Sequence, residues 1–274
     1  MLNLYYFFKG ENTMKRIFAL MLVLCMALTV MVACNNSNDN ADDTTTTAGN
    51  NENADTTTAA NDEFDPAAKS EGVMTYAEYD AAAMDAEVVI EAYVQATQSW
   101  WDNKITVYTQ DTDGAYFIYE MTCSEEDSAK LVPGTKIRVT GFKTEWAGEV
   151  EIASGATFEI IEDAEAYIAE PFNATDLLGT DDLIKHQNEY AIFEGMTIVS
   201  IEYKNGEPGD DIYVKLSKNG AEYDFCVERY LTGPETDVYK AFADLKAGDV
   251  VDVAGFIYWY NAVNTHITAV VAAE

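Results

Sequence analysis

Two stretches of the chain, "LVPGTKIRVTGF" at residues 131–142 and "LKAGDVVDVAGF" at residues 245–256, follow the same pattern of residues. Both fit the template Leu-x-x-Gly-x-x-[Ile/Val]-x-Val-x-Gly-Phe. In the first copy Ile137 and Val139 alternate with polar residues, which is the pattern of a strand with one buried face. We interpret the two copies as the same strand of a folding unit that occurs twice in the chain.

The residues around the first copy predict a small, mainly β unit. Residues 87–97 are rich in β-branched and aromatic side chains, which favour strands. Ser124, which is followed by acidic residues, favours the start of a helix. The expected elements, in order, are a helix at 74–85, strands at 87–97, 104–110 and 115–121, a helix at 124–131, and strands at 135–142 and 148–153, the last extended by 157–161.

The residues around the second copy predict the same order of elements. Glu91-Ala92 of the first unit corresponds to Glu194-Gly195 of the second. The expected elements are one or two helical turns in 174–188, strands at 190–203, 212–217 and 221–230, a helix at 236–245, and strands at 249–260 and 265–272.

This order resembles the OB-fold, a five-stranded barrel with a helix between its third and fourth strands. The resemblance implies that the Gly after the template Leu turns the chain into strand four, and that the later Gly permits a bulge. The fold class is therefore mainly β, with two tandem OB-like five-stranded barrels, each with short helices. The boundaries that we predict are 71–165 for the first barrel and 170–274 for the second.

More closely, "VMTYAEY", "VIEAYVQA", "WWDNKITVY" and "DGAYFIYEM" resemble uncharacterised bacterial lipoproteins with tandem OB-like domains. The N-terminal sequence agrees with export as a lipoprotein. Residues 1–33 read as a signal segment, with Met14 as the expected true start, and "MVAC" is similar to a lipobox that ends at Cys34. The resemblance implies cleavage before Cys34, a lipid on its sulfur and an extracytoplasmic anchor on the bacterial cell membrane. The alternative is a plain transmembrane helix, for which the apolar run is a little short.

Residues 34–70 carry the composition of a disordered acidic linker. Asn, Asp, Thr and Ala dominate it, and no large apolar residue occurs before Phe64. Such a segment cannot bury enough apolar surface to offset the entropy of ordering. We predict a tether that lifts the barrels away from the lipid surface.

The charge disfavours nucleic acid as a partner. The formal net charge is −32, and the 13 Lys and Arg outside the signal segment are scattered along the chain. Binding to nucleic acid depends on Lys and Arg that displace counterions from phosphates. The acidity indicates solubility and excludes no uncharged ligand.

The sequence offers no recognisable catalytic constellation, cofactor motif or metal site. His186 and His266 are the only histidines, and either reads as an ordinary surface residue. Residues 109–120 match part of a calcium loop, but Thr109 stands at the first position and strands flank the turn, so a β-hairpin explains Asp113-Gly114 better. We therefore expect a protein that is not an enzyme.

Cys123 and Cys226 are the two cysteines outside the signal segment and the lipid site, and they occupy nearly equivalent places in the two units. A disulfide between them is one interpretation. Two separate thiols are the interpretation that we favour, because equivalent positions in neighbouring barrels need not meet.

Aromatic residues near the expected loops are the candidate ligand-binding residues. They are Trp100, Trp101, Trp146, Tyr258, Trp259 and Tyr260. Such rings stack on sugars, on bases or on protein side chains, while the competing explanation is that they plug the barrels or bury the seam between them. We predict a non-catalytic binding module whose ligand is a saccharide, a cell-wall glycan or a protein. The alternatives are a structural interaction subunit of a surface assembly and an OB-fold nucleic-acid binder.

Overall fold

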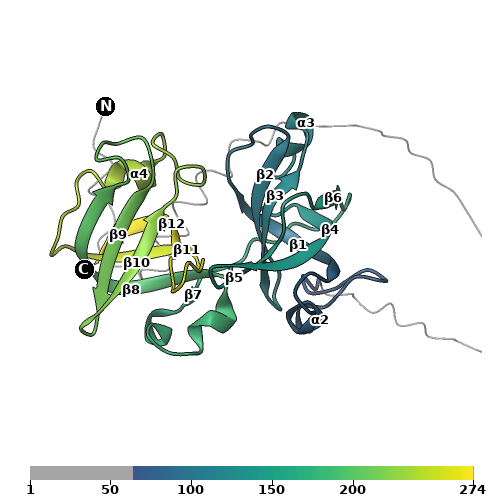
Figure 1. Cartoon of the computed structure of the whole chain (residues 1–274), viewed down its shortest axis with the longest axis horizontal. Helices are drawn as coiled ribbons and strands as arrows, with labels where there is room; N and C mark the ends of the chain where they lie inside the picture. Colours follow the sequence, from purple (N-terminus) through teal and green to yellow (C-terminus); the bar gives the residue numbers. More distant parts are fainter. Residues whose placement is uncertain (1–63, 274) are drawn as a thin grey trace, which may run out of the picture. The chain divides into compact units, whose positions relative to one another are not determined.

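The computed structural model describes residues 64–273, and the first barrel occupies the N-terminal part of this range. Its five strands are β1 (Glu87–Thr97), β2 (Lys104–Gln110), β3 (Ala115–Thr122), β4 (Lys136–Trp146) and β5 (Glu149–Ile152). They pair in the order β1-β2-β3-β5-β4, and antiparallel pairing of β1 with β4 closes the sheet (Figure 1). The predicted bounds of β1 and β2, 87–97 and 104–110, are confirmed.

The second barrel repeats this topology strand for strand. Its strands are β8 (Tyr190–Tyr203), β9 (Ile212–Lys218), β10 (Ala221–Val227), β11 (Val250–Phe256) and β12 (His266–Ala272). The order is β8-β9-β10-β12-β11, closed by antiparallel pairing of β11 with β8. In both barrels the third and fifth strands pair in parallel, as Phe117 does with Glu151 and Cys226 with His266. The two barrels are therefore OB-like, as predicted.

Each barrel carries one additional strand. β6 (Thr157–Ile160) pairs antiparallel with β4, so the prediction that residues 157–161 extend the fifth strand is wrong. β4 bends enough to pair with β6 through its first half and with β5 through its second half. β7 (Phe172–Asn173) pairs in parallel with β8 in the second barrel.

The helices are short and their starts follow capping rules. α2 (Tyr76–Ala81) begins after Thr75, which forms a capping box with Glu78. α3 (Glu125–Ser128) and α4 (Asp237–Ala241) each lie between the third and fourth strands of a barrel. The segment before the second barrel contains the 3₁₀ turns η1 (Thr175–Leu177) and η2 (Leu183–His186). No helix within residues 64–273 is long and apolar enough to cross a membrane.

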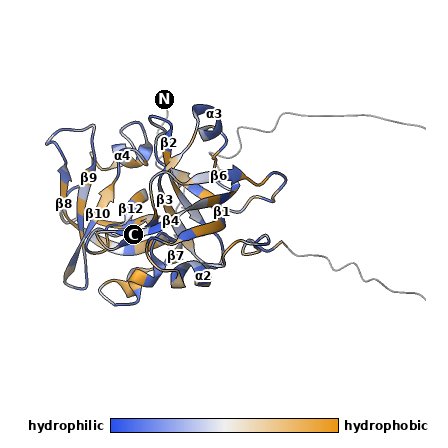
Figure 2. Cartoon of the chain, turned by 45° about the vertical axis from the view of Figure 1, so that its right-hand side comes forward, coloured by the Kyte–Doolittle hydropathy of each residue, from blue (hydrophilic) through white to orange (hydrophobic). Residues whose placement is uncertain are grey.

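Each barrel has its own apolar core, formed by the inward side of its alternating strands. Val88, Ile90, Val107 and Ile118 are among the fully buried residues of the first core. Figure 2 shows apolar and polar residues intermixed along the strands, as expected where only one face of each strand points inward. The second core is centred on side chains of β8, β9, β10 and β11.

The glycines of the template perform two different tasks. Gly134 and Gly248 precede the fourth strands with φ of 93° and 92°, a conformation that favours glycine and turns the chain as predicted. At Gly255 the pairing of β11 with β12 shifts register, so the predicted bulge is confirmed there. At Gly141 the β1–β4 register runs without a shift. Gly141 is instead needed for close approach, because a Cβ would come 2.5 Å from Cγ2 of Ile152.

The last strands differ from the prediction in one respect. The strand predicted at 249–260 ends at Phe256, and residues 257–265 leave the sheet as a loop. The equivalent strand β4 continues to Trp146 and returns through a two-residue turn. That turn, Ala147-Gly148, has positive φ at both residues, which suits a tight hairpin.

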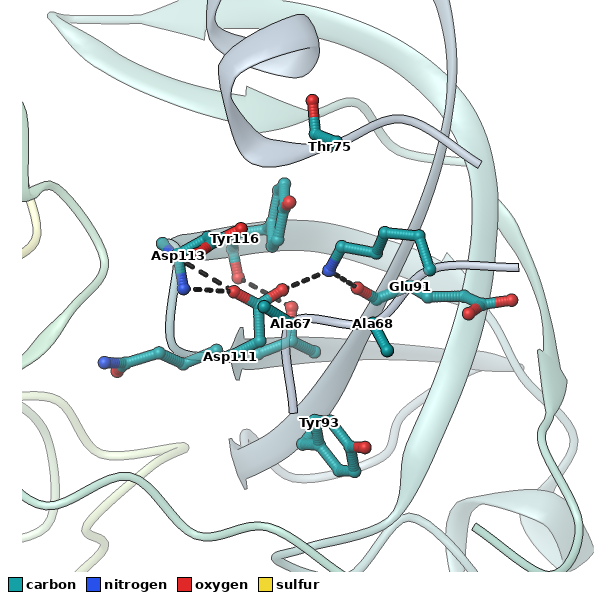
Figure 3. A network of polar contacts seen from close by, with 12 residues as sticks. Ala67, Ala68, Thr75, Glu91, Tyr93, Asp111, Asp113 and Tyr116 are labelled. Atoms are coloured by element: carbon teal, nitrogen blue, oxygen red, sulfur yellow. Dashed lines mark hydrogen bonds and ion pairs between the residues drawn. The ribbon is translucent and has the colours of Figure 1, made fainter. Parts of the chain in front are cut away.

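Residues 64–73, which we call the N-terminal strap, lie against the first barrel. Lys69 forms a buried ion pair with Asp111 and donates to the backbone carbonyl of Glu91 at 2.7 Å (Figure 3). The backbone N–H of Ser70 donates to Oε2 of Glu91. Lys69 and Ser70 fall at the end of the range that the sequence assigns to the linker, 34–70, so the contacts of the barrel begin before the predicted boundary. The side chain of Asp111, which belongs to residues 109–120 of the calcium interpretation, is therefore paired with Lys69.

Candidate binding site at the seam of the barrels

The two barrels belong to one compact unit and meet through a buried seam. The ring of Tyr108, on the outer side of β2, stacks on the ring of Phe256 with 4.4 Å between centroids. Its hydroxyl lies 2.5 Å from Nδ1 of His266. The backbone N–H of Tyr190 donates to Oε1 of Gln110 at 2.8 Å. These contacts join the outer face of the first barrel to β8, β11 and β12.

The prediction that His266 is an ordinary surface residue is wrong, because its side chain is buried in this seam. Burial lowers the pKa of His266 to about 4, so the imidazole is neutral at pH 7. The ring also stacks on Tyr258 at 4.3 Å. His266 therefore serves the contact between the barrels.

The equivalent hairpins of the two barrels touch each other at the seam. The backbone N–H of Trp259, in the loop 257–265, donates to Oε2 of Glu149 at 2.8 Å. The N–H of Asn261 donates to the carbonyl of Ala147 at 2.6 Å. A Cβ at Gly148 would come 2.8 Å from the Trp259 ring, so only glycine lets the turn approach this closely.

Glu149 is fully buried at this contact and has one unsatisfied oxygen. Its Oε1 has no hydrogen-bond partner within the described part of the chain, and neither has the buried Oδ1 of Asn188. The Asn188 carboxamide lies within hydrogen-bonding reach of Glu149. Burial raises the pKa of Glu149 to about 8, although the contacts of Asn188 and Trp259 lower it. A proton on Oε1 of Glu149 would remove the buried charge and turn this oxygen into a hydrogen-bond donor.

Glu151 is a second carboxylate on the same outer face of the barrel. Glu149 and Glu151 lie opposite Trp146 and Thr144 in the β4–β5 ladder, and directly opposite residues project from the same face. The side chain of Glu151 forms no hydrogen bond or ion pair with residues 64–273, although the residue is only 7% exposed. Burial raises its pKa to about 7.

Two of the six predicted rings, Trp146 and Tyr260, lie exposed beside these carboxylates. Trp146 is 61% exposed at the end of β4, and Tyr260 is 53% exposed in the loop 257–265. The hydrogen bond from Asn261 to Ala147 places the Tyr260 segment beside the turn that follows Trp146. The structure thus brings together the backbone segments that carry these two rings, which lie at equivalent positions in the two copies of the template.

The adjacent rings of Tyr258 and Trp259 are partly buried. Tyr258 packs edge-on against Phe117 at 5.3 Å, and Trp259 packs against the core of the second barrel. Most of the surface of these two rings is therefore buried in the seam, in agreement with the competing explanation.

Trp100 and Trp101 occupy a different place. Trp100 packs against the core of the first barrel, and its indole N–H donates to the carbonyl of Cys123 at 2.9 Å. Trp101 is exposed on the loop between β1 and β2, where Ser99 is hydrogen bonded to the carbonyl of Tyr230. Trp100 is thus a structural residue, and Trp101 borders another part of the contact between the barrels.

Sequence reasoning missed Tyr119, which completes the group of rings. Tyr119 is exposed on β3 and lies 6.5 Å from Phe117, ring to ring. The alternation of β3 was the available signal, because Tyr116 and Ile118 belong to the core and Phe117 and Tyr119 must then point outward. We call Tyr119, Trp146, Tyr258 and Tyr260 the seam rings, and Glu149 with Glu151 the seam carboxylates.

A shallow hollow of ≈ 390 Å³ adjoins the seam rings on the second barrel. Tyr260 lines it together with side chains of β9 and β10 and with the loop 257–265. The lining residues include Tyr213, Glu222, Tyr223 and Asp224. Aromatic and acidic residues therefore continue from the seam rings onto the second barrel.

The basic side chains of the described chain are nearly all engaged by oxygen atoms. Eleven of the 13 Lys and Arg form ion pairs with Asp or Glu. The other two, Lys143 and Lys218, donate to backbone carbonyls. Residues 64–273 contain 39 Asp and Glu against these 13 basic residues. The negative surface therefore repels phosphate groups.

Metal-ligating side chains and cysteines are the other reactive groups within residues 64–273. No cluster of three or more His, Cys, Asp or Glu in this range could hold a metal ion. Cys123 and Cys226 are both free and buried, which confirms the interpretation as separate thiols. Burial raises the pKa of Cys123 to about 11, so its reactive thiolate form is suppressed. Cys34 and Met14 lie outside the described residues.

Neither a protein-family model nor a curated protein matches the chain. Among solved structures, the Ifi202 HINa domain in complex with 20bp dsDNA is 9% identical with a TM-score of 0.32, covering 66% of this chain and 94% of that chain. A murine DNA binding protein bound with ds DNA is 11% identical with a TM-score of 0.33, covering 69% and 100%. A Replication Protein A heterotrimer bound to ssDNA is 10% identical with a TM-score of 0.29, covering 69% and 52%. Similarity this low carries no conclusion about function, and the fold rests on the strand order given above.

Proposed function

We propose that this protein is a non-catalytic binding module that is anchored outside the bacterial cell through a lipid on Cys34 and holds a saccharide chain against the seam rings. The observation that supports it most is the exposure of Trp146 and Tyr260 beside Glu151, a carboxylate that has no partner within residues 64–273. Aromatic faces stack on the apolar face of a sugar, and a carboxylate accepts hydrogen bonds from its hydroxyls.

The charge pattern favours this ligand class over nucleic acid. A protein that binds DNA or RNA places Lys and Arg on phosphates, and 11 of the 13 basic side chains are already paired with carboxylates. Breaking such pairs to bind phosphate would leave unpaired carboxylates next to the ligand. A neutral or positively charged ligand meets no such penalty.

A titration with matched variants tests the saccharide proposal. The full-length chain, purified in detergent, is titrated calorimetrically with a panel of oligosaccharides and cell-wall fragments. Trp146→Ala should weaken binding by up to about 10-fold, because a stacked ring contributes about 0.5–1.5 kcal/mol. The control is Phe142→Ala, which removes another exposed ring from β4 that lies opposite Glu87.

Three outcomes would contradict this proposal. The first is that no saccharide in the panel binds. The second is that Phe142→Ala weakens binding as much as Trp146→Ala does. The third is retardation of single- or double-stranded DNA in a gel at low salt, which would favour the nucleic-acid alternative. Co-purification of one protein partner without any saccharide binding would support a structural interaction subunit instead.

The anchor is tested separately from the ligand. Cells that express the full chain are labelled with a tagged fatty acid and fractionated. We expect the label on the wild-type protein, and Cys34→Ala should lose the label and leave the membrane fraction. Cys123→Ala is the matched control, because Cys123 is a buried free thiol inside the first barrel. A label that survives Cys34→Ala would refute the anchor.

A further inference from the structure

Glu151 stands out among the buried polar groups because its charge has no internal partner. Two other buried carboxylates of the first barrel, Glu91 and Asp111, are paired with Arg138 and Lys69, and Glu149 accepts the backbone N–H of Trp259. Glu151 is 7% exposed, and its side chain forms no ion pair or hydrogen bond inside residues 64–273. A charge that is removed from water is costly unless a partner compensates it. Neither carboxylate oxygen of Glu151 is among the fully buried unsatisfied atoms of the described residues, so both remain open to a ligand, and a cation or a strong hydrogen-bond donor would compensate the charge.

The surroundings of Glu151 also suit a cation. Phe117 lies beside Glu151 in the parallel β3–β5 pair, and Phe117 contacts both Tyr119 and Tyr258. Trp146 is diagonal to Glu151 across the β4–β5 hairpin, within reach of a long side chain. Faces of Tyr and Trp attract cations through their ring electrons. Ring faces and a carboxylate therefore converge at one edge of the seam.

The ligand that fits both features is a sugar that carries a positive charge. We propose that the seam rings select saccharide chains with free amino groups, whose ammonium pairs with Glu151 while the sugar ring stacks on Trp146 or Tyr260. This inference rests on the proposed function, because it names the class of saccharide that the same site would hold. It differs from that function in requiring the amino group.

Protonation of Glu151 predicts how binding depends on pH. Burial raises the pKa of Glu151 to about 7 in the free protein, so a large share of the carboxyl is neutral at pH 6. An ammonium ion binds the ionised form and must displace that proton at lower pH. Affinity should therefore fall as the pH drops below 7, by up to about tenfold per pH unit, for as long as the ligand stays charged.

Oligomers of glucosamine and of N-acetylglucosamine with equal length provide the test, because they differ only at the nitrogen, which is a basic amine in the first and a neutral acetamide in the second. The full-length chain is titrated with both at pH 7. We expect the glucosamine oligomer to bind at least 10-fold more tightly. Glu151→Gln should remove this preference while it leaves binding of the acetylated oligomer within about twofold.

Glu145→Gln is the matched control for general attraction between a cationic ligand and an acidic protein. Glu145 is exposed on β4, and its substitution removes the same charge without touching Glu151. We expect the preference for glucosamine to survive in this variant. Loss of the preference in Glu145→Gln as well as in Glu151→Gln would mean that net charge, and not the site, attracts the ligand.

The outcomes distinguish failure of saccharide binding from failure of the selectivity for amino groups. If neither oligomer binds, the proposed function itself fails. If both bind equally and Glu151→Gln changes nothing, saccharide binding stands and the amino-group inference is overturned. If a lysine-rich peptide binds through Glu151 and the sugars do not, the partner is a protein and the inference is also overturned.

Discussion

Arg138 in the first barrel and Asp252 in the second occupy the same position of the repeated template. Their charges are opposite, and the first donates hydrogen bonds whereas the second accepts one. The Arg138 guanidinium donates to Oε1 of Glu91 through Nε at 2.9 Å and Nη2 at 2.8 Å. Asp252 accepts the backbone N–H of Gly195 at 2.7 Å, where the pairing of β8 with β11 shifts register. One barrel uses the position to bind an acidic side chain, and the other uses it to satisfy a bulge.

The comparison shows which features of the repeat specify the fold. Alternating apolar residues and glycines are common to both copies and produce the same strand order. The polar positions and the loops differ between the copies, and they make contacts that the other copy lacks. Glu91 of the first barrel fastens the N-terminal strap through Ser70. The loop 257–265, which replaces the tight turn Ala147-Gly148, reaches the seam.

The largest effect should come from the last glycine of the template, and it should differ between the barrels. In Gly255→Ala the new Cβ would fall well inside contact distance of the His266 backbone carbonyl, which cannot move without disrupting β12. In Gly141→Ala the nearest atoms belong to the side chains of Ile152 and Ala156. We expect a loss of more than about 4 kcal/mol for Gly255→Ala and about 1–3 kcal/mol for Gly141→Ala. Urea unfolding measures both, and equal losses would contradict the comparison.

The second prediction compares the stability lost when Arg138 and Asp252 are each replaced. Burial raises the pKa of Glu91, but hydrogen bonds from Ser70 and Arg138 outweigh it and hold the pKa below its usual value. Arg138→Leu leaves that charge without its main partner and should cost about 3 kcal/mol. Asp252→Ala removes one acceptor from a backbone N–H and should cost about 1–2 kcal/mol.

The double variant Arg138→Leu with Glu91→Gln is the control for this prediction. It removes the charge together with its partner, so it should recover much of the stability that Arg138→Leu loses. Failure to recover would show that Arg138 acts through packing and not through Glu91. Chemical denaturation of the single and double variants at one pH and one salt concentration is sufficient.

The sequence predicted the barrels well because their signals are local. β-Branched and aromatic residues at 87–97 and 104–110 mark strands without any knowledge of their neighbours, and the two bounds agree with the structure. The site was predicted in part. Trp146 and Tyr260 were found because both lie at the same distance from a template glycine. Glu151 could not be singled out, because the acidic sequence contains many carboxylates and no local pattern records which of them becomes buried.

The third prediction concerns the meeting of the two hairpins at Glu149. The pKa of about 8 lies above that of an unfolded Glu, so the folded protein binds a proton more tightly and loses stability as the pH rises from 4.5 to 8. Glu149→Gln supplies a neutral side chain of the same size, whose oxygen can still accept the N–H of Trp259. We expect the variant to be more stable than the wild type by about 2 kcal/mol at pH 8. Its stability should also depend less on pH than that of the wild type between pH 6.5 and 8, because one raised carboxyl pKa is removed.

Glu145→Gln is the control, because Glu145 is exposed on the same hairpin. It should change the stability by no more than about 0.5 kcal/mol at any pH. Thermal unfolding at pH 6.5 and pH 8 measures both variants. A Glu149→Gln variant that is less stable than the wild type at pH 8 would mean that the carboxylate is ionised in the folded protein and held by contacts stronger than its burial penalty.

The smallest effect should come from the helices between the third and fourth strands, which again differ between the barrels. Thr236 caps α4 by accepting the N–H of Tyr239, whose ring is buried, whereas Ser124 caps α3, which buries none of its residues. Loss of either cap leaves helix N–H groups without a partner, but only α4 transmits that loss to a core. We expect Thr236→Ala to cost about 1 kcal/mol and Ser124→Ala less than about 0.5 kcal/mol in urea unfolding. A larger loss for Ser124→Ala would show that the helix of the first barrel supports its barrel as strongly as the buried helix of the second.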